Sequence, residues 1–214
     1  MGRRKKEPRN VHRESIASAA QNLFMTKGIE ATSMNDIAKE AGYSKATIYV
    51  YFQSKEEIVG LLVLESMKKL NDYIFSALSE YSSSKKRYEL ICQALLRYQE
   101  EFPFYFELAL DEINIDFEQV DYLPEEKETF RIGEEINQKL HQFLQEGILA
   151  GEIRADIKVL PTIMAFWGML SGLIQVGTKK EMYIKQELQL SKQDFLTYGF
   201  DTLYNSIANK EDRQ

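Results

Sequence analysis

Apolar residues recur with the spacing of an α-helix in the N-terminal part of the chain. The first repeat predicts an amphipathic helix that ends near Gly28, because a glycine commonly follows the last turn of a helix. The apolar positions of this helix, three and four residues apart, are Ile16, Ala19, Ala20, Leu23 and Phe24. One face of the helix is therefore expected to lie in a hydrophobic core.

Two shorter helices are predicted directly after it. The run Ser33-Met34-Asn35-Asp36 is similar to a capping box, so a helix of about two turns begins there and stops at Gly42. Ser44 caps the next helix, in which Ile48 and Phe52 point inward four residues apart. Residues 41–44 form the tight turn between the two helices.

The rest of the chain keeps the helical period and predicts six further helices, about nine in all. The residues that mark their beginnings are Ser54, Ser82 to Ser84, Pro103, Pro124, Pro161 and Ser191. The helix from Pro103 is expected to run through Ile113, and residues 114–123 are expected to form a loop. No strand pattern appears, so the predicted fold class is all-α.

Charge is distributed unevenly along the chain. Residues 1–55 hold 10 Lys and Arg against 5 Asp and Glu, whereas residues 56–214 hold 17 against 28. The first quarter can therefore face phosphate, and the remainder would repel it. This division predicts a DNA-binding domain over residues 1–55 and a regulatory domain over residues 56–214.

Composition also indicates the compartment. Cys92 is the single cysteine, so no intramolecular disulfide can form, and the first residues are basic with no apolar run after them. The cytoplasm is the expected location. The longest apolar stretch, around residues 159–176, is interrupted by polar residues, so we expect a buried helix and no contact with a membrane.

Two short helices joined by a tight turn predict a helix-turn-helix, whose second helix can enter the major groove of DNA. An ordinary helical hairpin has the same spacing, so the residues themselves decide. The runs ATSMNDIA over residues 31–38 and AGYSKATIYVYFQSKEE over residues 41–57 closely resemble the N-terminal signature of TetR-family regulators. The resemblance covers roughly residues 10–60.

The resemblance implies an N-terminal three-helix DNA-binding domain and a helical C-terminal domain that binds ligand and dimerises. It also implies a homodimer, paired through its last two helices, that binds a near-palindromic operator in double-stranded DNA. A small-molecule effector of unknown identity would release this repressor from the operator. An activator of the same fold remains an alternative.

The candidate DNA-binding residues lie in and beside the second short helix. Small side chains on its outer face would let the helix sit deep in the groove, where a hydroxyl or a methyl group can read base edges. The resemblance implies that a tyrosine and a lysine of this region contact phosphate, namely Tyr49 and Lys55, although the tyrosines of this segment could also pack in the core. The full candidate set is Ser33, Ser44, Lys45, Ala46, Thr47, Tyr49, Tyr51 and Lys55.

Basic residues before and within the first helix give a second candidate contact with DNA. They could form an arm that tracks the phosphate backbone or reaches the minor groove, or equally a solubilising tail. These residues are Arg3, Arg4, Lys5, Lys6, Arg9 and Arg13.

Aromatic residues are dense between Tyr98 and Phe130, next to the predicted loop. They could line an effector pocket, or they could be plain core aromatics with solvated acids nearby. The candidate ligand-binding residues, including two from the later helices, are Phe102, Phe104, Phe106, Glu107, Tyr122, Met164 and Trp167. Gly168, Gly172 and Gly199 could permit close packing, either at a dimer interface or within one subunit.

Enzymatic readings find little support. A di-iron helical bundle needs Glu-x-x-His pairs, and neither His12 nor His141 supplies one. One cysteine and two histidines also argue against a zinc site or a Cys/His catalytic pair, and no phosphate-binding glycine loop exists. We therefore expect no enzyme, no metal and no cofactor. A helical adaptor that binds only protein would leave the basic first quarter unexplained.

Overall fold

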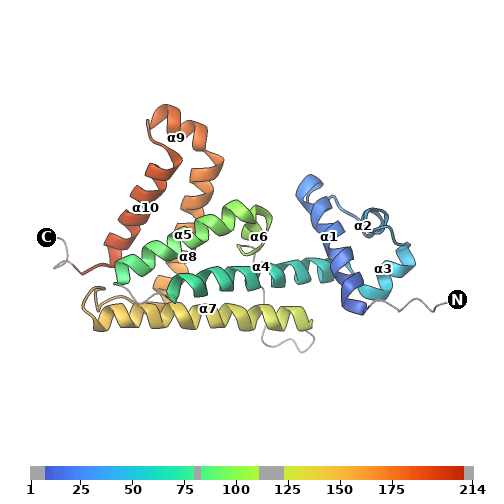
Figure 1. Cartoon of the computed structure of the whole chain (residues 1–214), viewed down its shortest axis with the longest axis horizontal. Helices are drawn as coiled ribbons and strands as arrows, with labels where there is room; N and C mark the ends of the chain where they lie inside the picture. Colours follow the sequence, from blue (N-terminus) through green and yellow to red (C-terminus); the bar gives the residue numbers. More distant parts are fainter. Residues whose placement is uncertain (1–7, 80–82, 111–122, 210–214) are drawn as a thin grey trace. The chain divides into compact units, whose positions relative to one another are not determined.

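The computed structural model describes residues 8–79, 83–110 and 123–209, in which every named element is an α-helix (Figure 1). The predicted all-α fold class is confirmed. The ten helices of these residues are α1 (Arg9–Lys27), α2 (Met34–Ala41), α3 (Lys45–Tyr51), α4 (Lys55–Leu78), α5 (Ser84–Glu101), α6 (Pro103–Leu108), α7 (Pro124–Leu149), α8 (Val159–Lys179), α9 (Glu181–Glu187) and α10 (Lys192–Ile207). The predicted loop at residues 114–123 lies outside the described residues except for Leu123.

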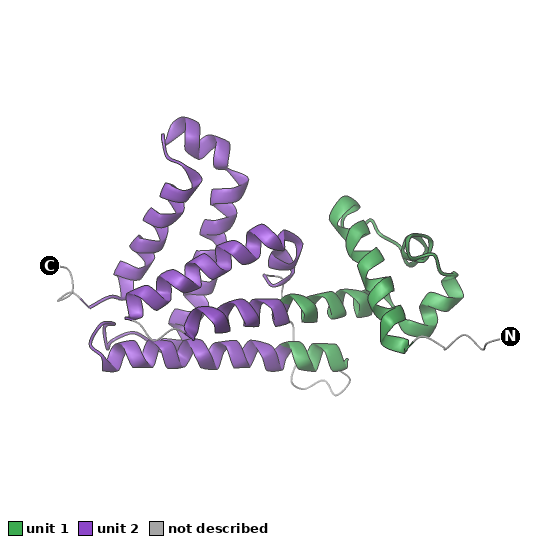
Figure 2. Cartoon of the chain, viewed as in Figure 1, with its two compact units in different colours: residues 1–66, 113–129 green, residues 67–112, 130–214 purple. Residues whose placement is uncertain are grey.

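The chain divides into two compact units (Figure 2). Of the described residues, 8–66 and 123–129 belong to the first unit, and the others belong to the second. Helices α4 and α7 each begin in the first unit and continue into the second. The expected functional division after residue 55 remains a prediction.

The first unit has its own small hydrophobic core, built from α1, α2, α3 and the start of α4. Apolar side chains at helical spacing on each of these elements point into it, as the sequence pattern predicts. The core side chains, none more than 4% exposed, include Ile16, Ala20, Phe24, Ile37, Ile48, Phe52 and Ile58. This core fixes the orientation of α3, whose opposite face is exposed.

The second unit contains the larger core. Its most deeply buried side chains, none more than 2% exposed, include Leu95, Tyr98, Phe106, Ile174 and Leu196. The segment after α7 returns to the end of α10, where the backbone N–H of Arg154 donates to the carbonyl of Ile207 (3.0 Å). An isolated antiparallel bridge between Ile153 and Ala208 closes this contact.

Helix boundaries differ from the prediction in the C-terminal part. Helix α6 ends at Leu108, and α8 begins at Val159, so Pro161 occupies the first turn, where its missing N–H has no intrahelical acceptor to lose. The prediction missed α9, since no glycine or proline marks the bend at Lys180. The segment before α10 also contains no glycine or proline. Gln189 there adopts a φ of 55°, a conformation that glycine adopts more easily.

The expectation that α8 is a buried helix is only half correct. The helix is long and apolar enough to cross a membrane, as core helices of soluble proteins can also be, but only 22% of an apolar stretch of 18 of its residues is buried. One face packs in the core of the second unit. The other face exposes Leu160, Met164, Met169 and Val176.

Candidate DNA-binding surface and effector cavity

The turn between α2 and α3 is fixed by polar caps. Ser33 and Asp36 form the predicted capping box, with the Ser33 N–H donating to Asp36 Oδ2 (3.0 Å) and the Asp36 N–H donating to Ser33 Oγ (3.2 Å). The Ser33 hydrogen bonds, with the ammonium of Lys27 at 2.9 Å, hold the pKa of Asp36 well below its ordinary value. Gly42 then ends α2 at a left-handed φ of 71°, and Ser44 caps α3.

The outer face of α3 is exposed and carries little charge. Lys45 and Ala46 are exposed on its first turn, Tyr49 is 40% exposed and Val50 is 63% exposed. Ile48 on the opposite face is fully buried. A short helix with an exposed face that carries little charge and includes small side chains such as Ala46 has the form of a recognition helix for the major groove.

Thr47, the candidate base-reading hydroxyl, is half-buried at the edge of this face. Its Oγ1 lies 2.8 Å from Ser44 Oγ, and either hydroxyl can be the donor. Ser44 Oγ also accepts from the Thr47 N–H (3.1 Å). Only one hydroxyl hydrogen is used within the pair, so the other remains available to a base or phosphate oxygen.

Two of the three tyrosines near α3 pack on a histidine of α1. The Tyr43 hydroxyl lies 2.8 Å from His12 Nδ1, and the rings of Tyr51 and His12 lie 5.2 Å apart. Tyr43 and Tyr51 are both half-buried, whereas Tyr49 is exposed. The packing therefore leaves Tyr49 as the tyrosine best placed to reach a phosphate.

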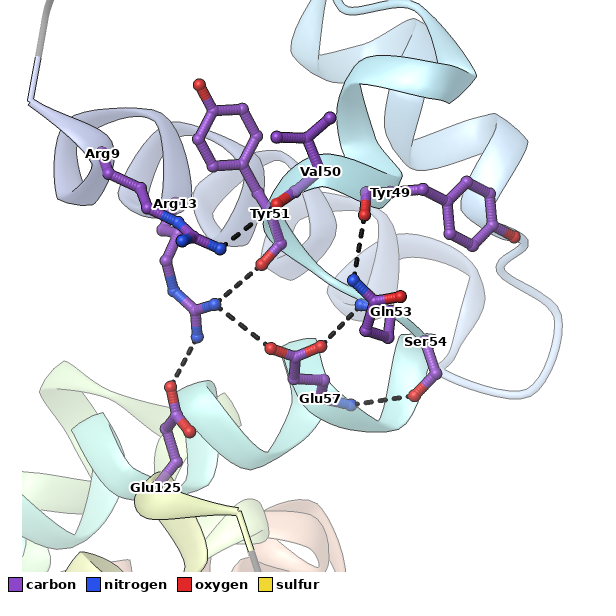
Figure 3. A network of polar contacts seen from close by, with 9 residues as sticks. All are labelled: Arg9, Arg13, Tyr49, Val50, Tyr51, Gln53, Ser54, Glu57 and Glu125. Atoms are coloured by element: carbon purple, nitrogen blue, oxygen red, sulfur yellow. Dashed lines mark hydrogen bonds and ion pairs between the residues drawn. The ribbon is translucent and has the colours of Figure 1, made fainter.

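Side chains from outside α3 satisfy the carbonyl groups at its C-terminal end (Figure 3). The last carbonyls of any helix lack intrahelical partners, and α3 has no basic residue of its own in its last turn. The three bonds run from Gln53 Nε2 to the Tyr49 oxygen (3.1 Å), from Arg9 Nη2 to the Val50 oxygen (3.2 Å) and from Arg13 Nη1 to the Tyr51 oxygen (2.7 Å). The cations also oppose the negative end of the helix dipole.

Arg9 and Arg13 are thus part of a helix and not of an extended arm or tail, and contact of the basic residues with DNA remains a prediction. Both residues lie in α1 and bind carbonyl groups of α3, and the earlier basic residues lie outside the described part of the chain. The sequence held a signal for Arg13, because it stands three and four residues before the buried Ile16 and Ala17. A cation on a buried helix face needs partners within the fold.

Lys55 begins α4 and is half-buried. Its Nζ donates to the carbonyl oxygen of Ile29 in the loop between α1 and α2 (2.8 Å). A cation in the first turn of a helix is unfavourable because of the helix dipole. The bond to Ile29 compensates for this within the protein, whereas the resemblance implied a DNA phosphate as the partner of Lys55. All eight candidate DNA-binding residues lie in the first unit, and their contact with DNA remains a prediction.

The second unit contains an apolar cavity with an empty volume of about 580 Å³, which includes space open to solvent. Residues of α4, α5, α7, α8 and α10 line it, almost all through carbon atoms. Its walls include Tyr88, Leu95, Leu140, Phe143, Phe166 and Trp167. Such a cavity suits the hydrophobic body of a small molecule.

Of the six candidate ligand-binding residues that the structure describes, only Trp167 lines this cavity. Phe106 is buried in an aromatic cluster with Tyr98 and Phe102, Phe104 is half-buried, and Met164 is 56% exposed. Glu107 pairs with Lys179 on the surface (3.1 Å), and Tyr122 lies outside the described residues. Phe102 and Phe106 thus pack with Tyr98 of α5, and a ligand-binding role for the candidate residues remains a prediction.

Polar groups of the cavity wall are few. The Tyr88 hydroxyl donates to the carbonyl of Phe200 in α10 (3.0 Å), and burial raises the pKa of Tyr88. Cys92, which is not among the lining residues, is buried, and burial raises the pKa of its thiol to about 12, so the thiol stays protonated. Thr162 supplies a further hydroxyl. A ligand here would gain most of its affinity from apolar contact.

The glycines of α8 and α10 separate into two groups. A Cβ added at Gly199 would collide with the Leu173 side chain, so this glycine permits close packing of α8 and α10 within one chain. A Cβ added at Gly168 or Gly172 would meet no atom within 4 Å. These two glycines lie on the exposed part of α8.

In the described residues, no group of three or more histidine, cysteine, aspartate or glutamate side chains could hold a metal ion. The geometry of the first unit is that of a helix-turn-helix DNA-binding protein, and the second unit adds a helical domain with an apolar cavity. These features define a class of ligand-responsive DNA-binding regulators.

Comparison with known proteins gives the family. The model for bacterial regulatory proteins of the tetR family matches residues 16–62. The nucleoid occlusion factor SlmA of Vibrio atlanticus is 30% identical over 191 residues, which cover 78% of this chain and 96% of that protein. The uncharacterized HTH-type transcriptional regulator YfiR of Bacillus subtilis is 28% identical over 176 residues, 79% of this chain and 82% of the relative.

Solved structures agree in fold. The transcriptional regulator FadR from Bacillus subtilis, crystallised in complex with stearoyl-CoA, superposes with a TM-score of 0.66 at 20% identity, covering 91% of this chain and 98% of that one. The chain belongs to the TetR family. It is a DNA-binding transcription regulator and not an enzyme, and regulators of this family bind DNA and small-molecule effectors as dimers.

Proposed function

We propose that this protein is a repressor that binds a near-palindromic operator as a homodimer and leaves it when a small molecule enters the cavity of the second unit. The observation that carries the proposal is the exposed, sparsely charged face of α3, held by caps at both ends. Such a preorganised helix can enter a groove without a further ordering cost. Because operator DNA lies in the bacterial cytoplasm, the protein would act there.

The outward faces of α8 and α10 supply the proposed dimer interface. They expose Met164, Met169, Val176 and Tyr198, the last to 71%. Large exposed apolar side chains on α8 and α10, two helices that pack together, are candidates for such a surface. Gly168 and Gly172 would let the backbone of a second copy approach closely.

We assign contacts with base edges and contacts with phosphate to different residues of α3 and α4. Lys45, Ala46 and Thr47 are proposed to face base edges, because they occupy the exposed first turn of α3. Tyr49 and Lys55 are proposed to contact phosphate, with Ser33, Ser44 and Tyr51 at the borders of the surface. Phosphate contacts fix the register of the helix, and base contacts choose the sequence.

The proposed effector has a long or bulky apolar body. The carbon walls of the cavity around Leu140, Phe143 and Trp167 support this choice, since they offer little to a charged group. The likeness in fold to FadR, solved with stearoyl-CoA, points in the same direction. Fatty acyl compounds are therefore the first ligands to test.

Selection of binding sites from random double-stranded DNA tests the DNA-binding function. We expect the full-length protein to enrich an inverted repeat with half-site centres about 34 to 36 Å apart, so that each recognition helix meets a successive major groove. Two chains should bind each selected site. Enrichment of no common sequence, or of a single half-site bound by one chain, would contradict the proposal.

A further inference from the structure

Arg13 lies at the junction of four elements of the first unit. Its Nη1 donates to the carbonyl oxygen of Tyr51 at the end of α3 (2.7 Å) and lies 3.2 Å from a carboxylate oxygen of Glu57 in α4. Its Nη2 lies 2.5 Å from Glu125, the second residue of α7, and its guanidinium stacks on the Phe52 ring at 4.2 Å. All these residues belong to the first compact unit. Figure 3 shows the contacts of Arg13 with Tyr51, Glu57 and Glu125.

The chemistry of the guanidinium makes these contacts interdependent. Arg13 presents its N–H groups in one rigid plane, so it cannot follow a displaced Glu125 without moving the N–H that holds Tyr51. The side chains of Arg13, Glu57 and Glu125 are only 19%, 14% and 17% exposed, so solvent screens their attraction less than that of a surface pair. The charged bonds are also stronger than neutral ones.

Glu57 extends the same network to the start of α4. Its second carboxylate oxygen accepts from the backbone N–H of Gln53 (2.6 Å), and the Gln53 side chain in turn binds the Tyr49 carbonyl. The Glu57 N–H donates to Ser54 Oγ (3.3 Å), while the Glu57 carboxylate reaches one residue further back, to Gln53. The contacts of Arg13 with Tyr51 and Glu57 therefore lead to the backbone of α3 and of the segment that follows it, and its contact with Glu125 leads to α7.

Helix α7 connects Glu125 to the cavity through one continuous helix. Ile136 is the first of its residues to line the cavity, 11 positions or about 16 Å along the helix axis from Glu125. Leu140, Phe143 and Leu144 line it further on. A shift or rotation of α7 that accommodates a ligand would therefore be felt at its first turn.

We propose that the ion pair between Arg13 and Glu125 is a latch through which α7 sets the orientation of the recognition helix. Glu125 is then a positioning residue for operator binding, although it contacts no DNA. The inference rests on the proposed function, since it assigns a control point to the same DNA-binding surface. Loss of the latch loosens the C-terminal end of α3 and leaves its reading face intact.

The test compares Glu125→Gln with Glu135→Gln in the full-length protein. Glu135 is on the same helix and pairs with Arg131 and Lys139, so its variant makes the same change in charge and also removes surface ion pairs. The probe is the operator obtained by site selection, titrated at several salt concentrations. We expect Glu125→Gln to bind at least about fivefold more weakly than Glu135→Gln, a typical size for a coupling between sites. The salt slope should not change, because no phosphate contact is lost.

Hydrogen exchange separates a latch from simple stabilisation of the fold. Coupling is reciprocal, so operator binding should slow amide exchange in residues 126–129 of the wild type and of Glu135→Gln. It should not do so in Glu125→Gln or in Arg13→Gln. In a double-mutant cycle, the second substitution should add little to the first.

The outcomes distinguish this inference from the function on which it rests. If site selection yields no operator for the wild type, the proposed function itself fails. If the wild type binds its operator and Glu125→Gln matches Glu135→Gln in affinity and in amide protection, the latch is wrong. Thermal unfolding of each variant shows whether it is folded, and Arg13→Lys serves as a second probe of the latch if Arg13→Gln does not fold.

Discussion

The Nζ of Lys55 lies 2.8 Å from the carbonyl oxygen of Ile29, so the first residue of α4 is tied to the loop between α1 and α2. One N–H of the ammonium is used in this bond, and the others can still reach a phosphate. Lys55→Ala should weaken binding to all DNA sequences about equally and reduce the salt slope by about one unit. The measurement is affinity at several salt concentrations, with Lys158→Ala in the second unit as the control for charge. If Lys55→Ala leaves the salt slope of DNA binding unchanged and lowers the unfolding midpoint, Lys55 stabilises the fold and does not contact phosphate.

The first turn of α3 should behave differently, because base contacts depend on sequence. Thr47→Ala or Lys45→Ala should alter which bases are tolerated, with about 1 to 3 kcal/mol of discrimination at stake for each good contact. Binding to the selected operator and to each of its single-base variants measures this effect. Equal losses across all variants would show that other residues read the sequence.

Trp167 offers a direct report on the cavity, because it is the chain's single tryptophan and lines the cavity wall. A fatty acyl ligand that enters should change its fluorescence, raise the unfolding midpoint and weaken operator binding. Phe143→Ala should lower ligand affinity, whereas Phe104→Ala, away from the cavity lining, should leave it close to the wild-type value. A larger loss of ligand affinity in Phe104→Ala than in Phe143→Ala would place the effector at the aromatic cluster near α6.

The glycines of α8 and α10 allow the proposed interface to be tested apart from folding. Gly172→Leu should fold normally and shift the protein from dimer towards monomer in sedimentation, because a Cβ at this position meets no atom of the chain within 4 Å. Gly199→Leu should instead lower the unfolding midpoint, because Leu173 occupies the space. A fully dimeric Gly172→Leu would mean that another surface mediates pairing.

Most of the fold could be predicted from short-range sequence signals, namely capping residues, glycines at helix ends and the spacing of apolar residues. Capping residues such as Ser33 and Ser44, a glycine such as Gly42, and apolar spacing on α1 act within a few residues, so the sequence reveals them directly. The helix α9 was missed because the chain bends at Lys180 without a local breaker. There the packing of the second unit decides the boundary.

The sites were harder to predict because they join distant segments. Arg13 and Glu125 are 112 positions apart, and no local pattern connects them. The cavity is lined by ordinary core residues from five helices, so no local cluster of aromatic residues in the sequence indicates it. Arg13 was the one residue of this network whose position in the sequence indicated a tertiary contact, because it is a cation on the buried face of α1.

Competition between the selected operator and a scrambled duplex of equal length tests the central claim most directly. A sequence-specific regulator should prefer the operator by a factor of about 10³ or more at physiological salt, with two chains bound to each duplex. The preference should persist as salt rises, while binding to the scrambled duplex falls steeply. Equal affinity for both duplexes, with the same salt dependence, would show that the protein binds DNA only through its charge and would contradict the account.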